Sequence, residues 1–275
     1  MSGLRYVYAV CRPFRSALQS QLTGVAGLPP RQLTHHGLVA VYSSVPEGDF
    51  AEEPLRAHLE DLDWLTRTAR AHQGVIDALT VVTTPLPLRL ATVFRDDSAV
   101  RTMMEAREAY FLRTLDRLEG RVEWGVKVYV EQEAEDAGTG PATERPVSGR
   151  EYLRQRRIRA RTHETVWQTA VEFAGRLHAT LSSYAEDSRL HNPQSTALSG
   201  ASGRNVLNAA YLVPRGDSEE FVELVDRTKD DSPGMRVELT GPWAAYSFTG
   251  EETGEETGEE TGGETGDETE EREGR

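Results

Sequence analysis

RVEWGVKVYVE, at residues 121–131, is the stretch that most strongly indicates how this 275-residue chain folds. Its apolar residues alternate with polar or small ones, as in a β-strand that packs one face on a core. The residues of that face are Val122, Trp124, Val126, Val128 and Val130. We expect this strand to complete the sheet of a first α+β domain, residues 1–131. Residues 132–148 contain glycine and proline and one large apolar side chain, which is typical of a solvated linker.

Upstream of this strand, the hydrophobic pattern alternates between strand and helix. We predict strands at residues 4–10, 37–45 and 81–94, and helices at 49–80 and 98–118. Pro85 and Pro87 lack a backbone donor, so the third strand should lie at a sheet edge. Ser98 is the predicted N-cap of the second helix, and Gly120 follows its end. This order predicts a small mixed sheet.

Downstream of the linker, residues 149–248 predict a second α+β domain. A long helix is expected at 149–185, a buried strand at 206–213, an amphipathic helix at 217–230 and a closing strand from Met235.

The charge of the chain is unevenly distributed. The 31 Lys+Arg and 45 Asp+Glu residues give a formal charge of −14, which argues against a simple nucleic-acid-binding protein. Residues 249–275, built on repeats of EETG, hold twelve acidic residues and two arginines, a net −10 that leaves −4 for the remainder. Glycine at every fourth position disfavours a helix by about 1 kcal/mol each. We therefore expect a disordered acidic tail.

The sequence offers little evidence of catalytic chemistry. Cys11 is the only cysteine, which excludes an internal disulfide and fits a reducing cytoplasm. No two histidines have the helical spacing of a metal site, and after His163-Glu164 the place of a second histidine is taken by Trp167. The Ser-Gly segment at 199–203 lacks the strand-turn-helix context of a serine nucleophile, and no phosphate-binding glycine motif occurs. We predict no catalytic, cofactor-binding or metal-binding residues.

Several polar and aromatic residues nevertheless have two interpretations. His72 lies on the apolar face of its helix, where it fits a core position better than a general base. GREYLRQRRIRAR, residues 149–161, forms either a solvated helix face or a surface for an acidic protein, the acidic tail or RNA. The four tryptophans are expected as core anchors: Trp64, Trp124, Trp167 and Trp243.

Segments spread over residues 4–248 together resemble one family, the gas vesicle GvpF/GvpL family of accessory proteins. They are RYVYAV, DLDWLTRTARAHQGVIDAL, PLPLRLATVF, EWGVKVYV, GREYL, NAAYLVPR and VELTGPWAAYSF. The chain departs from the family pattern at Leu90-Ala91, where the family usually has Phe-Gly, and at Ala244-Ala245, where prolines are more frequent. These departures concern local turn or edge geometry.

The resemblance implies two α+β domains, the first a modified ferredoxin-like unit. It also implies a non-catalytic factor of gas vesicle assembly that contacts the hydrophobic shell protein GvpA and other accessory proteins, including copies of itself. We expect no nucleic-acid or membrane partner, and a location at the gas vesicle and in the cytoplasm. The chain has no leader peptide pattern and no apolar run of about 18 residues.

Our hypothesis is a chaperone-like adaptor that covers apolar faces of the shell protein before assembly. Two alternatives remain. One is a small-molecule enzyme with a pocket between the domains around His72 and Arg89. The other is an RNA-binding module that uses Arg150 to Arg161.

Overall fold

Two antiparallel β-sheets organise the chain, and the computed structural model describes residues 3–15, 22–131, 149–193, 203–229 and 234–250. The first sheet comprises β1 (Leu4–Cys11), β2 (Arg31–His35), β3 (Leu38–Val45), β4 (Leu86–Pro87) and β5 (Val93–Phe94). Its order is β2-β3-β1-β4, with β5 also paired to β1. The second sheet comprises β6 (Arg121–Val130), β7 (Asp187–Leu190), β8 (Arg204–Pro214) and β9 (Met235–Trp243), in the order β7-β8-β6-β9.

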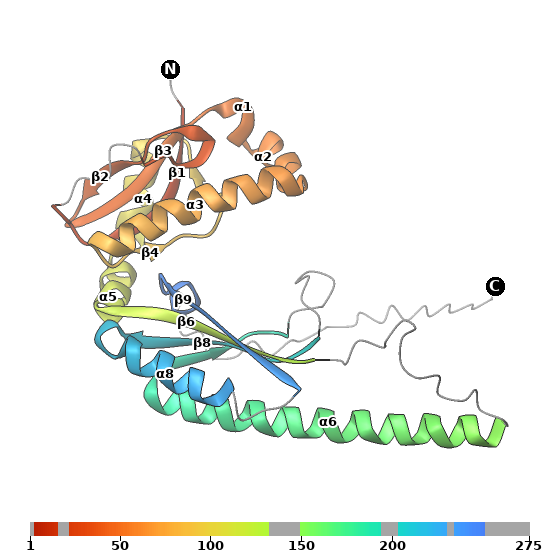
Figure 1. Cartoon of the computed structure of the whole chain (residues 1–275). Helices are drawn as coiled ribbons and strands as arrows, with labels where there is room; N and C mark the ends of the chain where they lie inside the picture. The colour runs from red at the N-terminus through yellow and green to blue at the C-terminus, as the bar shows by residue number, and fades with distance from the viewer. Residues whose placement is uncertain (1–2, 16–21, 132–148, 194–202, 230–233, 251–275) are drawn as a thin grey trace, which may run out of the picture.

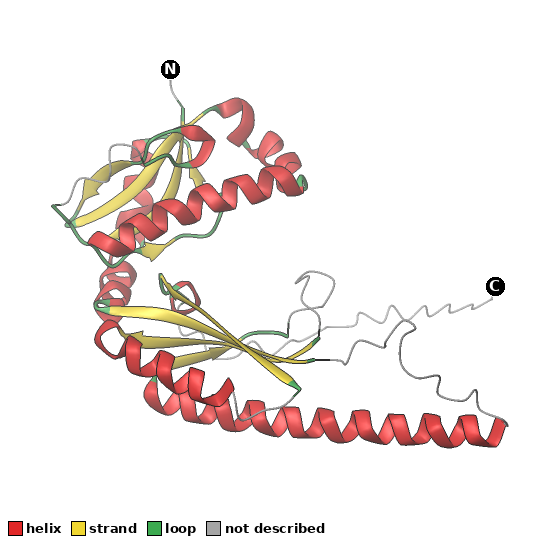
Figure 2. Ribbon diagram, viewed as in Figure 1, coloured by secondary structure: helices red, strands yellow, loops and turns green. Residues whose placement is uncertain are grey.

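Helices cover these sheets, which confirms the α+β fold class (Figure 2). The first half contains α1 (Glu47–Phe50), α2 (Glu52–Leu59), α3 (Leu62–Val82), α4 (Asp97–Ala106) and α5 (Glu108–Leu118). The second half contains α6 (Gly149–Tyr184) and α8 (Ser218–Lys229). Three single 3-10 turns are η1 (Val25–Gly27), η2 (Arg215–Asp217) and η3 (Tyr246–Phe248).

The central strand β1 is buried on both faces, because helices pack on each side of the first sheet. Tyr6 and Tyr8 face α3, whereas Val7 and Val10 face α4 and α5. The pairing of β1 with β3 shifts register between Val7 and Ala9, and such a bulge changes which side chains share a face. The simple alternation expected for residues 4–10 therefore ends at the bulge.

The predicted elements of the first half are present but differ in their bounds. The helix expected at 49–80 is three helices, and Asp61 caps the last of them by accepting hydrogen bonds from the backbone N–H groups of Asp63 and Trp64 at 2.9 and 3.1 Å. The helix expected at 98–118 is divided at Arg107, and its N-cap is Asp96, not Ser98.

The strand expected at 81–94 is limited to two short pairings. The first two residues of that range still belong to α3, and β4 and β5 each contain two residues. Pro85 and Pro87 interrupt the backbone donors that a longer strand would need. As the prolines predicted, β4 is an edge strand, because it lies at one end of the strand order β2-β3-β1-β4.

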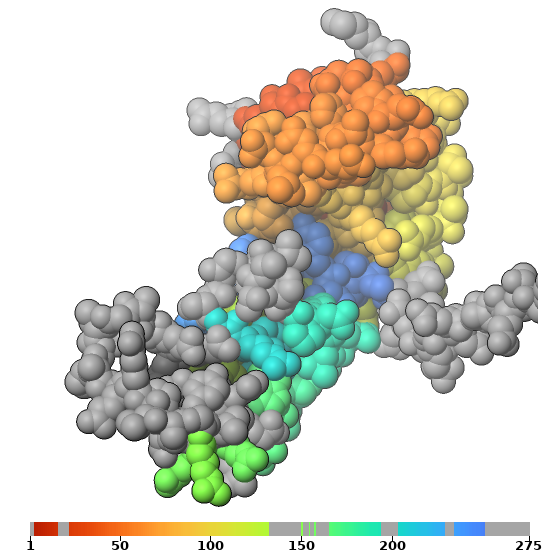
Figure 3. Space-filling view, turned by 90° about the vertical axis from the view of Figure 1, so that its right-hand side faces the viewer, coloured from red at the N-terminus to blue at the C-terminus, as the bar shows by residue number. Residues whose placement is uncertain are grey.

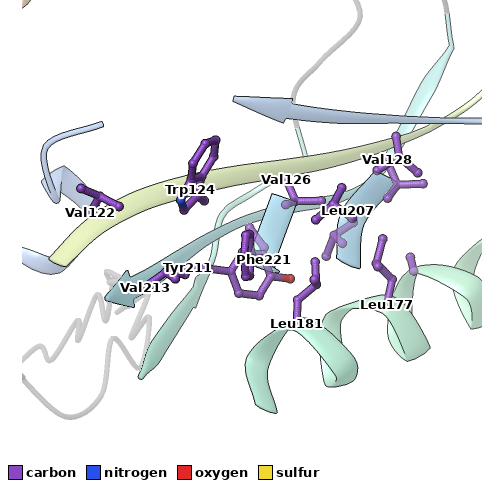
Figure 4. Close-up of a cluster of buried hydrophobic side chains, with 14 residues drawn as sticks. Val122, Trp124, Val126, Val128, Leu177, Leu181, Leu207, Tyr211, Val213 and Phe221 are labelled. Carbon is purple, nitrogen blue, oxygen red and sulfur yellow. The ribbon is translucent and has the colours of Figure 1, made fainter. Parts of the chain in front are cut away.

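Our expectation that residues 121–131 complete the first sheet is wrong. Strand β6 is a central strand of the second sheet, where it pairs antiparallel with β8 on one side and β9 on the other. The alternating pattern correctly predicted which side chains of β6 are buried together, since Val122, Trp124, Val126 and Val128 all enter one core. That core is completed by α6 and α8, which cover one face of the sheet (Figure 4).

The second sheet thus begins ahead of the predicted linker, and the boundaries 1–131 and 149–248 stay predictions. Residues 132–148 lie outside the described residues, as do 251–275 of the expected acidic tail. The elements expected at 149–185, 206–213 and 217–230 correspond closely to α6, β8 and α8.

The last described segment, residues 244–249, joins the two sheets, and we call it the clasp. Ala244 packs into the core of the first sheet, whereas Ala245 and Phe248 pack with Leu118 and Leu212. The clasp lies between the upper and lower parts of the molecule (Figures 1 and 3). Both alanines that depart from the family pattern are therefore buried where the two sheets meet.

Hydrogen bonds connect the clasp to β6 of the second sheet and to helices α3 and α5. The carboxylate of Glu123 in β6 accepts from the backbone N–H and the hydroxyl of Ser247, each at 2.8 Å. The Tyr246 hydroxyl donates to Gln73 Oε1 in α3 at 3.3 Å. Arg117 donates to the Phe248 carbonyl, and Tyr110 to that of Thr249.

Candidate functional site

A cavity of about 300 Å³ opens beside α3, and we call it the α3 cavity. Its walls come from three segments that are distant in sequence: the η1 turn, the end of α1 and the first half of α3. The lining residues are Gly24, Ala26, Gly27, Asp49, Phe50, Trp64, Arg67, Thr68 and Ala71. Two aromatic rings and small residues share this lining with three polar side chains, those of Asp49, Arg67 and Thr68. A mixed lining of this kind is typical of a site that holds an apolar group and orients it through a few polar contacts.

Helix α3 supplies its part of the wall through helical periodicity. Trp64, Arg67, Thr68 and Ala71 are spaced by three and four residues, so they share one face of the helix. The Asp61 cap fixes the start of that face. Trp64 packs against Phe50 with ring centroids 5.6 Å apart.

The opposite wall is the η1 turn, which is held by Tyr8. The Tyr8 hydroxyl accepts from the Val25 backbone N–H at 2.8 Å and donates to Ser43 Oγ at 2.8 Å. A Cβ atom at Gly24 would lie 2.3 Å from this hydroxyl, so only glycine permits the approach. Ala26 and Gly27 adopt positive φ angles of 57° and 70°. The cavity is therefore preformed by a tightly tied turn.

His72 follows the lining residue Ala71 in α3 but does not itself line the cavity. It is only 4 % exposed, and its Nδ1 is 3.0 Å from the Tyr6 hydroxyl. Tyr6 also accepts from the Ala91 backbone N–H at 3.1 Å. Burial lowers the pKa of His72 to about 4. His72 is thus a core histidine with one hydrogen bond, as expected, and its Nε2 has no partner among the described residues.

The other residue of the proposed enzyme pocket, Arg89, does not line the α3 cavity either. Arg89 is exposed in the turn before β5, where its carbonyl accepts from Thr92. The α3 cavity lies within the first half of the chain and not between the sheets. Cys11 is buried, and burial raises the pKa of its thiol to about 12.

The arginine-rich segment forms the first turns of α6, which extend past the second sheet (Figure 1). Arg150, Arg154 and Arg157 are exposed. The side chains of the other three arginines lie outside the described residues, as does the Ser-Gly segment up to residue 202. The exposure of these three arginines fits a solvated helix face and a partner-binding surface equally, so both interpretations stay open.

The tryptophans meet the expectation of core anchors only in part. Trp124 is buried in the second core, whereas Trp64 and Trp167 are half-buried. The guanidinium of Arg204 lies over the ring of Trp167, 4.0 Å from the ring centroid. Trp243 is 39 % exposed at the end of β9, so the core assignment is wrong for it.

One group of side chains that could hold a metal ion was missed by the sequence analysis. His35, His36 and Glu105 place one potential ligand atom each within 4.8 Å of one another. The search for histidines four apart on a helix could not find them, because a hairpin turn and a helix distant in sequence bring them together. The adjacent pair His35-His36 was the available signal.

No helix in the described part of the chain is long and apolar enough to cross a membrane.

The fold agrees with the comparisons. The family model described as "Gas vesicle synthesis protein GvpL/GvpF" matches residues 4–250. The chain therefore belongs to the GvpL/GvpF family, and its role is that of a gas vesicle accessory protein.

Two relatives are both from one Streptomyces species. The chain is 56 % identical to a protein named "Gas vesicle protein L" over 253 residues, covering 90 % of this chain and 93 % of the relative. It is 27 % identical to "Gas vesicle protein F" over 256 residues, covering 88 % and 98 %.

Solved structures share the fold. GvpF from Anabaena superimposes with a TM-score of 0.64 at 18 % identity, over 90 % of this chain and 97 % of that one. GvpF from Microcystis aeruginosa gives a TM-score of 0.65 at 18 % identity, over 91 % and 100 %. Because these likenesses cover about nine-tenths of the chain, the arrangement of two antiparallel sheets with covering helices is shared with both GvpF structures.

Proposed function

We propose that this gas vesicle accessory protein binds the small hydrophobic shell protein GvpA and delivers it to the growing vesicle as a chaperone-like adaptor. Membership of the GvpL/GvpF family supports a role as a gas vesicle accessory protein. The observation that carries the proposal is the α3 cavity, a hollow lined by Phe50, Trp64 and small residues together with a few polar side chains. A shell subunit would insert an apolar side chain there, between Trp64 and the η1 turn.

The surroundings of the cavity favour a protein partner over a small metabolite. Leu59 and Leu62, at the turn that leads into α3, are 41 % and 76 % exposed. Exposed aliphatic side chains beside an aromatic-lined hollow are typical of protein contact sites. Asp49 and Arg67 at the cavity would orient the partner through polar contacts. The remaining partners, other accessory proteins and further copies of this chain, belong to the same proposal, as does action in the cytoplasm.

The test fills the cavity. Ala71→Phe places a ring in the α3 cavity, and Ala78→Phe is the matched control. Ala78 is also half-buried and, seven residues further along α3, lies on the same helix face, but it does not line the cavity. Each variant is co-expressed with the shell protein and tested for co-purification and for suppression of shell-protein aggregation.

We expect Ala71→Phe to reduce co-purification at least tenfold and Ala78→Phe to leave it within twofold, with both variants folded by circular dichroism. Equal retention by the two variants would exclude the cavity as the binding site. If the parent chain neither associates with the shell protein nor reduces its aggregation, the adaptor function itself is wrong. Vesicle number and shape in cells that carry Ala71→Phe give the corresponding readout in vivo.

A further inference from the structure

The tip of the β2–β3 hairpin is joined to α4 and α5 by a cluster of two histidines and two glutamates. His35 Nε2 is 2.6 Å from Glu105 Oε1, and His36 Nδ1 is 3.0 Å from Glu108 Oε2. The two imidazole rings stack with centroids 4.3 Å apart and planes inclined by 25°. The cluster lies away from the α3 cavity, on the opposite face of the first sheet.

The backbone explains how two adjacent histidines reach the same place. Along an extended strand, neighbouring side chains point to opposite faces. His35 shares the face of Leu33, which packs in the core formed with α4 and α5. His36 leaves the strand with a φ of 47°, followed by Gly37 at 73°. This left-handed pair is the geometry of a two-residue type I′ hairpin turn, and it brings the His36 ring back onto that of His35.

The helices present the carboxylates in a matching arrangement. Glu105 lies in the last turn of α4 and Glu108 is the first residue of α5. Arg107, which is not helical, separates the two helices, and both carboxylates reach the hairpin tip across this break. Three donors, from His35, His36 and Glu105, have ligand atoms within 4.8 Å of one another, so they are close enough to be drawn around one ion by side-chain rotation.

The chemistry of these donors selects the ion. Two neutral imidazoles and a carboxylate are a ligand set of Zn²⁺, at distances of about 2.0–2.2 Å. Borderline transition metals such as Co²⁺ and Ni²⁺ accept the same donors, whereas Mg²⁺ and Ca²⁺ prefer oxygen alone. Glu108 would orient the His36 ring from outside or complete the coordination. The two carboxylates supply negative charge that a divalent cation would neutralise.

We propose that His35, His36 and Glu105, supported by Glu108, form a transition-metal site of the Zn²⁺ class that fastens the β2–β3 hairpin to α4 and α5. Hairpin and helices are separated by about 70 residues of sequence, so a bound ion would cross-link the first sheet to one of its covering layers. Because β2 is the edge strand of that sheet, the ion would also fix the edge. The site partly faces solvent, which makes the metal exchangeable.

The test uses the full chain without a polyhistidine tag, treated with a chelator and then titrated with ZnCl₂ by calorimetry. We expect one zinc ion per chain and a rise in Tm of several degrees at saturation. Co²⁺ should give the visible absorption of a low-coordinate nitrogen and oxygen site. His36→Asn removes a ligand while giving the turn its preferred Asn-Gly sequence, so this variant should fold at least as well as the parent.

We expect His36→Asn and Glu105→Gln each to weaken zinc binding at least tenfold and to abolish the Co²⁺ absorption. His191→Gln is the control, because His191 is exposed outside the cluster and should be dispensable. Zinc uptake that persists in both cluster variants, or that disappears in His191→Gln, would overturn the assignment. Absence of binding by the parent chain would leave the cluster as two histidine–glutamate ion pairs and would also overturn it.

Discussion

The buried carboxylate of Glu123 accepts two hydrogen bonds from Ser247, and this pair fastens the clasp to the central strand of the second sheet. Burial raises the pKa of Glu123 above its ordinary value, although both hydrogen bonds act in the opposite direction. A raised carboxyl pKa means that the folded state holds a proton that the unfolded state has released. The contribution of Glu123 to stability is therefore largest below the ordinary pKa and decreases as the pH rises through the folded value.

Replacement of Glu123 separates charge from hydrogen bonding. In Glu123→Gln, Oε1 still accepts from the Ser247 backbone N–H and Nε2 donates to Ser247 Oγ, so stability at pH 7 should equal or exceed that of the parent. Glu123→Ala leaves that N–H without its acceptor and should reduce the free energy of unfolding by about 1–3 kcal/mol. Urea unfolding of the three proteins at pH 5 and pH 7 measures both effects. A loss in Glu123→Gln as large as in Glu123→Ala would refute the role of the hydrogen bonds.

The place of Glu123 also illustrates what sequence could and could not predict. The alternation in residues 121–131 identified β6 as a strand with one buried face, because local spacing determines which side chains share a face. The choice of sheet depended on pairing with β8 and β9, strands about 80 and 110 residues away. No local pattern encodes such partners, so β6 was assigned to the wrong sheet.

The candidate sites were less predictable than the fold for the same reason. The lining residues of the α3 cavity that come from α3 follow helical spacing, but the η1 turn is brought beside them by tertiary contacts, among them the hydrogen bond between the Val25 N–H and the Tyr8 hydroxyl. His35 and Glu105 meet across about 70 residues. Helix ends, by contrast, were missed for local reasons, since Asp96 and Ser98 are both competent N-caps and tertiary packing chose the former.

The glycine at position 24 should be indispensable for the η1 turn. In Gly24→Ala, the added Cβ would lie 2.3 Å from Tyr8 Oη and 2.9 Å from the Leu28 carbonyl oxygen. We expect a loss of about 1–3 kcal/mol from this overpacking, together with weaker binding at the α3 cavity. Gly74→Ala is the control, because nothing lies within 4 Å of its Cβ position in α3. There, alanine should stabilise by up to about 1 kcal/mol. Thermal unfolding that ranks the two variants in the reverse order would contradict the close approach.

Ala91 occupies a position that suits glycine. Its φ of 63° lies in the left-handed region, where a side chain is unfavourable by about 1–2 kcal/mol. Ala91→Gly should therefore stabilise the chain by about 0.5–1 kcal/mol after the greater freedom of glycine in the unfolded state is subtracted. Ala78→Gly in the interior of α3 should instead lose about 1 kcal/mol. Chemical denaturation of both variants tests the difference, and destabilisation by Ala91→Gly would show that the turn requires the methyl group.

His72 should make the stability of the first sheet sensitive to mild acid. Its pKa is lowered to about 4 in the folded chain because burial disfavours the imidazolium, whereas an unperturbed histidine titrates near 6.5. Between these values the unfolded chain binds a proton that the folded chain does not, so stability decreases as the pH falls from about 6.5 to 4. The full decrease amounts to about 3 kcal/mol, at about 1.4 kcal/mol per unit.

His72→Phe isolates this contribution. The phenyl ring keeps the packing against Tyr6 and Tyr8, whose ring centroids lie 5.8 and 5.5 Å from that of His72. It removes the Nε2 atom, which has no hydrogen-bond partner among the described residues, but it also removes the nitrogen that pairs with the Tyr6 hydroxyl. We expect the variant to be about 1–3 kcal/mol less stable than the parent at pH 7, because that hydroxyl loses its partner, and to gain on the parent steadily toward pH 4.5. Glu123 is present in both proteins. Its opposite pH trend therefore cancels when the unfolding free energy of the parent is subtracted from that of the variant at each pH. Parallel curves for the two proteins would mean that His72 takes up its proton in the folded state as readily as in the unfolded chain.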